Sequence, residues 1–130
     1  ESPAGIQGKA TQFVMILDAL QLRLLEKIRS DLAGYSVVRS TSPLDNRAIW
    51  LEIFAGGIHK GNSCQTLLKK LNINCKEVAG LGNDYNDIDF LDICAEAYLV
   101  ANAPVNLQRH YKLVRSDKEE GFTEFISKVL

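Results

Sequence analysis

The sequence has no excess of basic residues, no long apolar run and no closely spaced pair of cysteines. Its 15 Lys and Arg residues are balanced by 16 Asp and Glu residues, so nucleic acid is not expected as a partner. No apolar run approaches the ~18 residues of a membrane-spanning helix, and we expect no membrane association. Cys64, Cys75 and Cys94 form no Cys-x-x-Cys motif, which argues against a disulfide framework or a zinc site. They are typical of reduced core thiols in a cytoplasmic protein.

The composition is that of a folded globular protein. Hydrophobic residues make up 46% of the 130 residues and charged residues 24%, which argues against disorder. The length fits one ordinary domain or a piece of a larger one. The sequence begins at Glu1 without a methionine, and we therefore expect a trimmed or cut chain.

The first part of the sequence predicts a small α/β layer with a mostly antiparallel sheet. Asp18 is expected to cap a helix, with Gln21 as its partner in a capping box, and Gly34 is expected to end that helix. Apolar residues at Leu24, Leu25 and their helical neighbours supply its buried face. The strands are predicted over residues 9–17, 35–39 and 48–54.

The pattern changes after the hinge Ala55-Gly56-Gly57, where strand and helix begin to alternate. Ser63 is expected to cap the first helix of this part. A strand from Val78 follows it. Later helices are predicted over residues 87–95 and 105–111 and from Asp117, with strands over residues 98–101 and 112–114. Such alternation is typical of half of a doubly wound parallel sheet.

An oxygen-rich loop follows the strand that begins at Val78. The run Gly82-Asn83-Asp84-Tyr85-Asn86-Asp87 leads into Ile88 and Leu91, which stand at helical spacing. It would place carboxylate and carboxamide groups at the carboxyl edge of a sheet, where open α/β folds bind ligands. Mg²⁺ prefers such oxygen donors. The alternative is an Asx-rich turn that merely caps the following helix.

A second loop carries Lys60 between two glycines, just before a helix. There the lysine can reach over a neighbouring site as a mobile point charge suited to phosphate, or it can be an ordinary solvated lysine. His59 and His110 have no partner pattern and are expected at the surface. Arg39 and residues 45–47 could meet a substrate, although a solvated turn explains them better.

The two loops together resemble the last two motifs of the haloacid dehalogenase-like phosphatases. The motifs are Gly57-Ile58-His59-Lys60-Gly61 and, after a helix and a strand, the loop from Gly82 to Asp87. The match is with the branch that carries an α/β cap, the Cof-type sugar phosphatases and their sucrose-phosphate phosphatase relatives. The runs Ala101-Asn102-Ala103-Pro104 and Glu120-Gly121-Phe122 also look like that branch. The resemblance implies a partial cap over residues 1–55 and the C-terminal part of the hydrolase core over residues 56–130.

The resemblance also implies roles for single residues. In this family an Asp attacks phosphorus, a second Asp two residues later acts as acid and base, and Mg²⁺ bridges the groups. Lys60 matches the lysine that holds the phosphate and the nucleophile, and Asn86 matches a residue near the phosphate. Asp87 matches the carboxylate that supports the metal's water shell. The usual first metal-binding Asp falls on Asn83, for which Asp84 next to it could substitute.

The sequence departs from the family by lacking the Asp-x-Asp motif. The nearest approach has Asp18 after an apolar run, but Leu20 stands where the second Asp belongs. The resemblance thus implies a chain that begins inside the cap, with the nucleophile outside it. Because phosphoryl transfer depends on positioning and charge neutralisation around a nucleophile, we expect this chain alone to be inactive.

The expected function is that of a cytoplasmic, Mg²⁺-dependent phosphatase acting on a small phosphorylated metabolite, such as a sugar phosphate. One alternative is a binding module that keeps the fold and has lost catalysis. Another is the phosphorylation domain of a cation-transport ATPase, which the β-rich first part and the missing membrane segment disfavour. An incomplete sheet would expose a strand edge, so we expect self-association or association with the missing N-terminal part.

Overall fold

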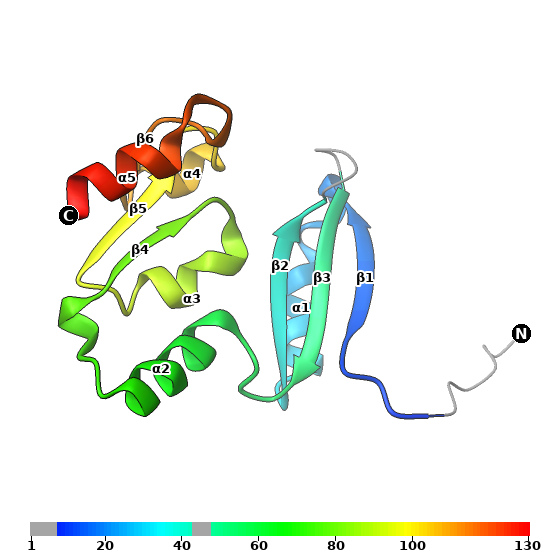
Figure 1. Ribbon diagram of the computed structural model, residues 1–130. Coiled ribbons are helices and arrows are strands. Elements are labelled where there is room, and N and C mark those ends of the chain that lie inside the picture. Colours follow the sequence, from blue (N-terminus) through cyan, green and yellow to red (C-terminus); the bar gives the residue numbers. More distant parts are fainter. Residues whose placement is uncertain (1–7, 43–47) are drawn as a thin grey trace, which may run out of the picture.

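Two three-stranded sheets form the framework of the computed structural model, which describes residues 8–42 and 48–130 (Figure 1). The first sheet is antiparallel, in the order β1-β3-β2, and consists of β1 (Phe13–Asp18), β2 (Tyr35–Thr41) and β3 (Ala48–Ala55). The second is parallel, in the order β4-β5-β6, and consists of β4 (Ala79–Gly82), β5 (Glu96–Val100) and β6 (Lys112–Val114). The predicted α/β fold is therefore confirmed.

One face of the first sheet is covered by α1 (Leu24–Asp31), which lies behind the strands in Figure 1. Leu17, Ile49 and Leu51 are buried from the strands and Leu25 from the helix. The register pairs odd-numbered residues with odd-numbered ones across all three strands. Since side chains alternate along a strand, the odd-numbered residues face α1 and the even-numbered residues face away from it.

The capping box predicted at Asp18 is present, but it closes a shorter element than expected. The Leu20 amide donates to Asp18 Oδ1 at 2.8 Å, and the Asp18 amide donates to Gln21 Oε1 at 3.0 Å. These bonds close the 3₁₀ turn η1 (Ala19–Gln21), and α1 begins only at Leu24. The prediction that a helix begins directly after Asp18 was therefore wrong.

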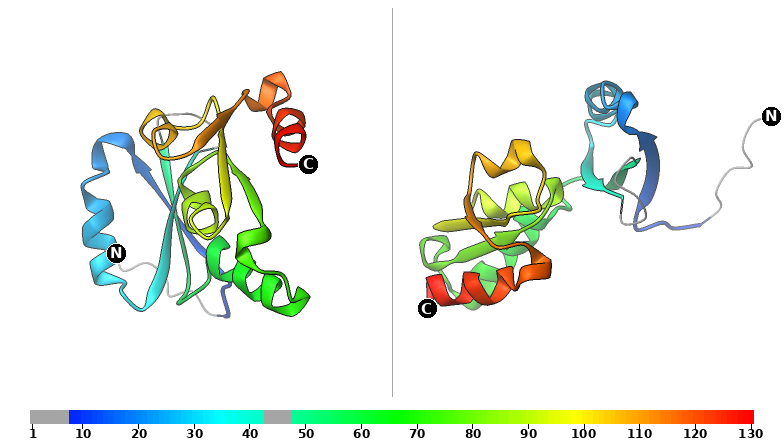
Figure 2. Two further views of the ribbon diagram at one scale, coloured as in Figure 1. Left: turned by 90° about the vertical axis from the view of Figure 1, so that its left-hand side faces the viewer. Right: turned by 90° about the horizontal axis from the view of Figure 1, so that it is seen from above.

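The second sheet is surrounded by short helices and 3₁₀ turns. They are α2 (Lys60–Leu71), η2 (Cys75–Glu77), η3 (Tyr85–Asp87), α3 (Ile88–Leu91), α4 (Val105–Gln108), η4 (Asp117–Glu119) and α5 (Gly121–Val129). α3 and α5 pack on opposite faces of the sheet (Figure 2). Tyr98 of β5 meets Phe125 of α5 with ring centroids 5.4 Å apart, whereas Gly80 and Gly82 of β4 face α3.

Other predicted helix boundaries also differ from the structure, and the helix predicted over residues 105–111 ends at Gln108. α2 begins at Lys60 because His59 is the extended residue before it, and Ser63 lies inside the helix. The helix predicted over residues 87–95 is the four-residue α3, preceded by η3. The last helix begins at Gly121, because Glu120 takes a left-handed conformation with φ 60° that separates it from η4.

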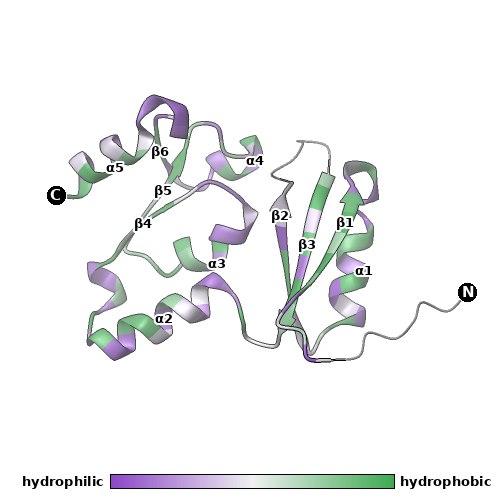
Figure 3. Ribbon diagram, turned by 45° about the vertical axis from the view of Figure 1, so that its right-hand side comes forward, coloured by the Kyte–Doolittle hydropathy of each residue, from purple (hydrophilic) through white to green (hydrophobic). Residues whose placement is uncertain are grey.

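No helix in residues 8–42 and 48–130 combines the length and the apolar character needed to cross a membrane. Figure 3 shows where the hydrophobic residues lie, and β1 is apolar over most of its length. Phe13, Val14, Met15 and Ile16 are nevertheless 40–61% exposed. The first sheet thus ends in an edge strand whose apolar side chains are only half covered.

Candidate functional site

The two loops singled out in the sequence meet at an ion pair between Lys60 and Asp87. Lys60 is the first residue of α2 and Asp87 is the last residue of η3, 27 positions later. Lys60 Nζ donates to Asp87 Oδ1. The side chain of Asp87 is 6% exposed and that of Lys60 51%, so a buried carboxylate holds a half-exposed ammonium group in place.

Two glycines allow these elements to come so close. A Cβ on Gly61 would lie 2.5 Å from the carbonyl oxygen of Asp89, and a Cβ on Gly82 would lie 2.8 Å from Cβ of Asp87. Both distances are far below an ordinary contact, so a side chain at either position would force the elements apart. The glycines beside Lys60 and before Asn83 therefore serve the approach of α2 and β4 to the site loop.

The second oxygen of Asp87 organises the loop before it. Asp87 Oδ2 accepts from the amides of Asn83 at 2.8 Å and Asp84 at 3.2 Å. Asp84 Oδ1 in turn accepts from the Tyr85 amide at 2.8 Å, which completes a capping box. The loop is thus the Asx-rich capping turn considered as the alternative, and the same turn holds Lys60.

Asp84 also joins this loop to the first sheet. The buried Asp84 accepts from the amide of Thr41 through Oδ2 and from its hydroxyl at 2.9 Å through Oδ1. Beside it, the guanidinium of Arg39 lies 3.6 Å from the centroid of the Tyr85 ring. Tyr85 also donates through its hydroxyl to Asn106 Oδ1 at 2.7 Å. The edge strand β2 is therefore held against η3 by hydrogen bonds and a cation–π contact.

A hollow of about 270 Å³ lies where the first sheet faces this loop. It is lined on one side by strands β2 and β3 and on the other by the start of α2 and the loop after β4. The lining residues are Ser40, Thr41, Trp50, Glu52, Lys60, Asn83, Asp84 and Asn86. A neighbouring hollow of about 230 Å³ shares Glu52, Lys60 and Asn86 with it and adds a largely apolar wall from Val38, Phe54 and Ile58. The predicted residues Lys60, Asn83, Asp84 and Asn86 thus share one hollow, with Asp87 bonded to its lysine.

Asn86 contributes an unusual group to this hollow. Its Oδ1 atom is buried and has no hydrogen-bond partner among the described residues. Leaving a buried polar atom unpaired costs about 1–3 kcal/mol, and such atoms often mark functional positions. Asn86 thus lines the same hollow as Lys60 and keeps one polar atom without a protein partner in the described part of the chain.

The described residues do not by themselves form a metal site. They contain no group of three or more His, Cys, Asp or Glu side chains placed to hold an ion. Every carboxylate oxygen of Asp84 and Asp87 already accepts from a protein donor. Asn83 is exposed and lines the same hollow as Asn86. This donor set fits Mg²⁺ in the type of atom but falls short in number and charge.

The two histidines differ in their surroundings. His59 Nδ1 lies 3.1 Å from Asp89 Oδ2, on the side of Lys60 where α2 meets α3, and it lines the smaller hollow. His110 is exposed next to Tyr111 and lines neither hollow of the site. Arg39 lies against Tyr85, whereas residues 45–47 fall outside the described part of the chain.

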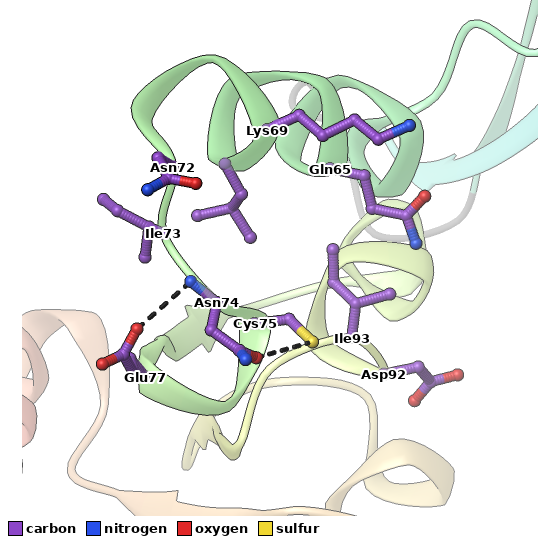
Figure 4. Close-up of a pocket in the computed structure, with 10 residues that line it drawn as sticks. Gln65, Lys69, Asn72, Ile73, Asn74, Cys75, Glu77, Asp92 and Ile93 are labelled. Atoms are coloured by element: carbon purple, nitrogen blue, oxygen red, sulfur yellow. Dashed lines mark hydrogen bonds between the residues drawn. The ribbon is translucent and has the colours of Figure 1, made fainter.

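A larger hollow of about 790 Å³ lies at the opposite end of α2 (Figure 4). Asn74 and Cys75 form part of its wall, and Ile93 faces them from the chain after α3. None of the predicted site residues lines it. Cys75 is exposed there, so the prediction that all the cysteines lie in the core was wrong for this one, whereas Cys64 and Cys94 are half-buried.

Comparisons with known proteins agree on one superfamily. The sequence model of the haloacid dehalogenase-like hydrolases matches residues 6–126. A protein of Buchnera aphidicola that is provisionally named a phosphatase is 26% identical over 82 residues, which are 61% of this chain and 30% of that protein.

Solved structures show the same fold. One from Streptococcus mutans superposes with a TM-score of 0.75 at 23% identity and covers 91% of this chain and 44% of its own. A subclass IIB sugar phosphatase of the haloacid dehalogenase superfamily superposes with a TM-score of 0.72 at 14% identity, covering 90% and 42%. The chain spans less than half the length of each of these proteins.

The sequence did not point to the residues that the first sheet brings to the hollow. Ser40, Trp50 and Glu52 lie on β2 and β3 and face away from α1. A signal was present, because Glu52 interrupts an otherwise apolar strand from Ala48 to Phe54. Thr41 is the last residue of β2 and binds Asp84, which no local pattern around it indicates.

Proposed function

This chain belongs to the family of haloacid dehalogenase-like hydrolases, and on that premise we propose that it forms part of a phosphatase. The substrate would be a small phosphorylated metabolite, such as a sugar phosphate. The observation that carries the proposal is the Lys60–Asp87 ion pair beside the unpaired Oδ1 atom of Asn86. Together they offer an anion a cation and a carboxamide in one hollow.

In this proposal Lys60 and Asn86 bind the phosphate. Lys60 is half-exposed and can turn its remaining N–H groups toward an anion while Asp87 keeps the ammonium group in place. Asn86 would donate to a phosphate oxygen through its amide nitrogen, since the two ends of a carboxamide are assigned only through their partners. Asp87 acts on the substrate through Lys60 and is a positioning residue.

The proposed cofactor is Mg²⁺. When the ion is bound, it would neutralise negative charge on the phosphate. Among Asn83, Asp84 and Asp87, the contacts favour Asn83 as the direct ligand. Asp84 is occupied by Thr41 and Tyr85, and Asp87 by Lys60 and the loop amides. Asp87 would support the ion from behind, by holding the loop that carries Asn83.

The proposed nucleophile is an aspartate outside this sequence. Its carboxylate would attack phosphorus, form an aspartyl-phosphate and release the alcohol, and water would then hydrolyse that intermediate to free phosphate. β4 pairs with β5 and with no other strand of the part that the structure describes. A further parallel strand at this edge would end next to the Gly82–Asp87 loop, which is consistent with a nucleophile supplied there.

We also propose that residues 1–55 act as a cap and residues 56–130 as part of the catalytic core. The contacts of Thr41 with Asp84 and of Arg39 with Tyr85 hold the first sheet over the site loop. Closure of such a cap would exclude water from the reacting phosphate.

Hydrolysis of p-nitrophenyl phosphate with Mg²⁺ tests the proposal. The chain alone is compared with the longest product of its gene, and each is compared with its Lys60→Ala variant. We expect activity only in a product that contains an Asp-x-Asp motif, and loss of that activity in Lys60→Ala. Activity in the chain alone would place the nucleophile within it. No activity in either would favour the alternative that the missing motif raises, a binding module without catalysis.

A further inference from the structure

We infer that Glu52 selects the substrate, so that the site takes a phosphorylated sugar or polyol and rejects a phosphorylated acid. The inference rests on the proposed function, because it needs the phosphate to be bound at Lys60. It adds the chemical class of the group that lies next to the phosphate.

The wall opposite Lys60 belongs to the uncovered face of the first sheet. The strand residues that line the two hollows are all even-numbered, apart from Thr41 at the end of β2, and therefore face away from α1. These residues are Val38, Ser40, Trp50, Glu52 and Phe54. Glu52 is the only one of them that carries a charge.

Glu52 lies within reach of a ligand bound to Lys60. It lines both hollows, and both also contain Lys60 and Asn86. A phosphate held by Lys60 and Asn86 would therefore direct the rest of a small substrate toward Glu52. The volumes of about 270 and 230 Å³ suit a small metabolite.

The carboxylate of Glu52 is fixed on one side and free on the other. Ser40 Oγ donates to Glu52 Oε1 at 3.0 Å, which orients the half-buried group. Oε2 has no hydrogen-bond partner in the described part of the chain. Because an ionised carboxylate only accepts hydrogen bonds, its partner in the substrate has to be a donor such as a hydroxyl group.

Trp50 and the charge of Glu52 further restrict the class of substrate that the site can bind. The aromatic ring of Trp50 lies in the same hollow and offers an apolar surface to the C–H groups of a sugar. A substrate with a second acidic group would bring a negative charge against Glu52. Such like-charge contacts discriminate by repulsion, so a phosphorylated hydroxy acid would bind poorly.

Binding can be followed by fluorescence, because Trp50 is the only tryptophan in the sequence. The complete chain is titrated with inorganic phosphate, glucose 6-phosphate and 3-phosphoglycerate, with calorimetry in parallel to detect binding that leaves the fluorescence unchanged. The test variant is Glu52→Gln. Glu26→Gln is the matched control, since Glu26 is an exposed glutamate of α1 on the other side of the sheet. Lys60→Ala reports on the phosphate itself.

We expect the chain to bind glucose 6-phosphate more tightly than 3-phosphoglycerate. Glu52→Gln should lower the affinity for glucose 6-phosphate about tenfold, because it replaces charge-assisted hydrogen bonds by neutral ones. The same variant should raise the affinity for 3-phosphoglycerate and leave the affinity for inorganic phosphate unchanged. Glu26→Gln should change none of the three affinities. Lys60→Ala should lower all three.

Two different results would overturn the inference. If phosphate binds and depends on Lys60, but Glu52→Gln leaves the preference between the two esters unchanged, the role of Glu52 is wrong and the proposed function stands. If neither phosphate nor its esters bind by either method, the proposed function fails and the inference fails with it.

Discussion

Asp87 joins the two loops of the site, because donors from both loops converge on its buried carboxylate. Lys60 Nζ and the amides of Asn83 and Asp84 all donate to it. Its burial is possible because each oxygen is paired, as buried charges require. The site therefore depends on a residue that would not itself contact the phosphate.

Asp87→Ala should lower the free energy of unfolding by about 2–4 kcal/mol, because it leaves buried donors without an acceptor. Urea denaturation followed through Trp50 measures the change. Asp31→Ala is the control, since Asp31 forms an exposed ion pair with Lys27 and such pairs contribute about 0–1 kcal/mol. Equal effects of the two substitutions would contradict the central role of Asp87.

Gly82→Ala should disturb the site through the backbone. The new Cβ would lie 2.8 Å from Cβ of Asp87 and 2.9 Å from Leu91 Cδ1, so β4 and α3 have to separate. Overpacking of this kind costs about 1–3 kcal/mol. Gly34→Ala is the matched control, because a Cβ there meets nothing within 4 Å. Thermal unfolding should show a clearly lower melting temperature for Gly82→Ala and an unchanged one for Gly34→Ala.

Burial raises the pKa of the Cys94 thiol to about 11, with smaller contributions from Cys64 and Cys75. Only the thiolate reacts with iodoacetamide, and at pH 8 the Cys94 thiol is almost entirely protonated. We expect mass spectrometry to find the exposed Cys75 alkylated first and Cys94 only as the pH approaches 11. Equal rates at pH 8 would show that Cys94 is not shielded in solution.

At the scale of elements, the important contact is between the edge of β2 and η3. Thr41→Val keeps the amide bond to Asp84 but removes the hydroxyl bond of 2.9 Å. We expect a loss of about 1 kcal/mol and faster hydrogen exchange at the Thr41 amide, because a buried acceptor loses one partner. Thr123→Val, at an exposed position of α5, should change neither quantity.

Element boundaries differed from the prediction where a tertiary contact set the start of a helix. Ser63 has the side chain of a typical cap, yet α2 starts three residues earlier, where Gly61 packs against the carbonyl of Asp89. Gly121 likewise has no room for a side chain beside the carbonyl of Arg115, at 2.1 Å from a Cβ. Both glycines were visible in the sequence, but the backbones they approach were not.

At the scale of the whole molecule, the apolar edge strand β1 predicts association. Phe13, Val14, Met15 and Ile16 are 40–61% exposed, and β1 pairs only with β3 among the described strands (Figure 3). Exposed apolar edges of this kind pair with other chains. Light scattering at increasing concentration should detect dimers or larger species. Ile16→Lys should shift the protein toward the monomer, and a monomer at high concentration in both forms would contradict the prediction.

The sequence by itself determined the class of the fold and the kinds of polar group that the two loops carry. Alternation, apolar spacing and turn residues act over a few positions, so an antiparallel layer followed by alternating strands and helices could be predicted. Lys60, Asn86 and Asp87 could be singled out by their motifs, although their roles remain proposals. Only the tertiary structure decided that Asp84 binds Thr41, 43 residues away, and that Glu52 faces Lys60 across a hollow. Contacts at such separations depend on how the two sheets pack, which no local pattern encodes.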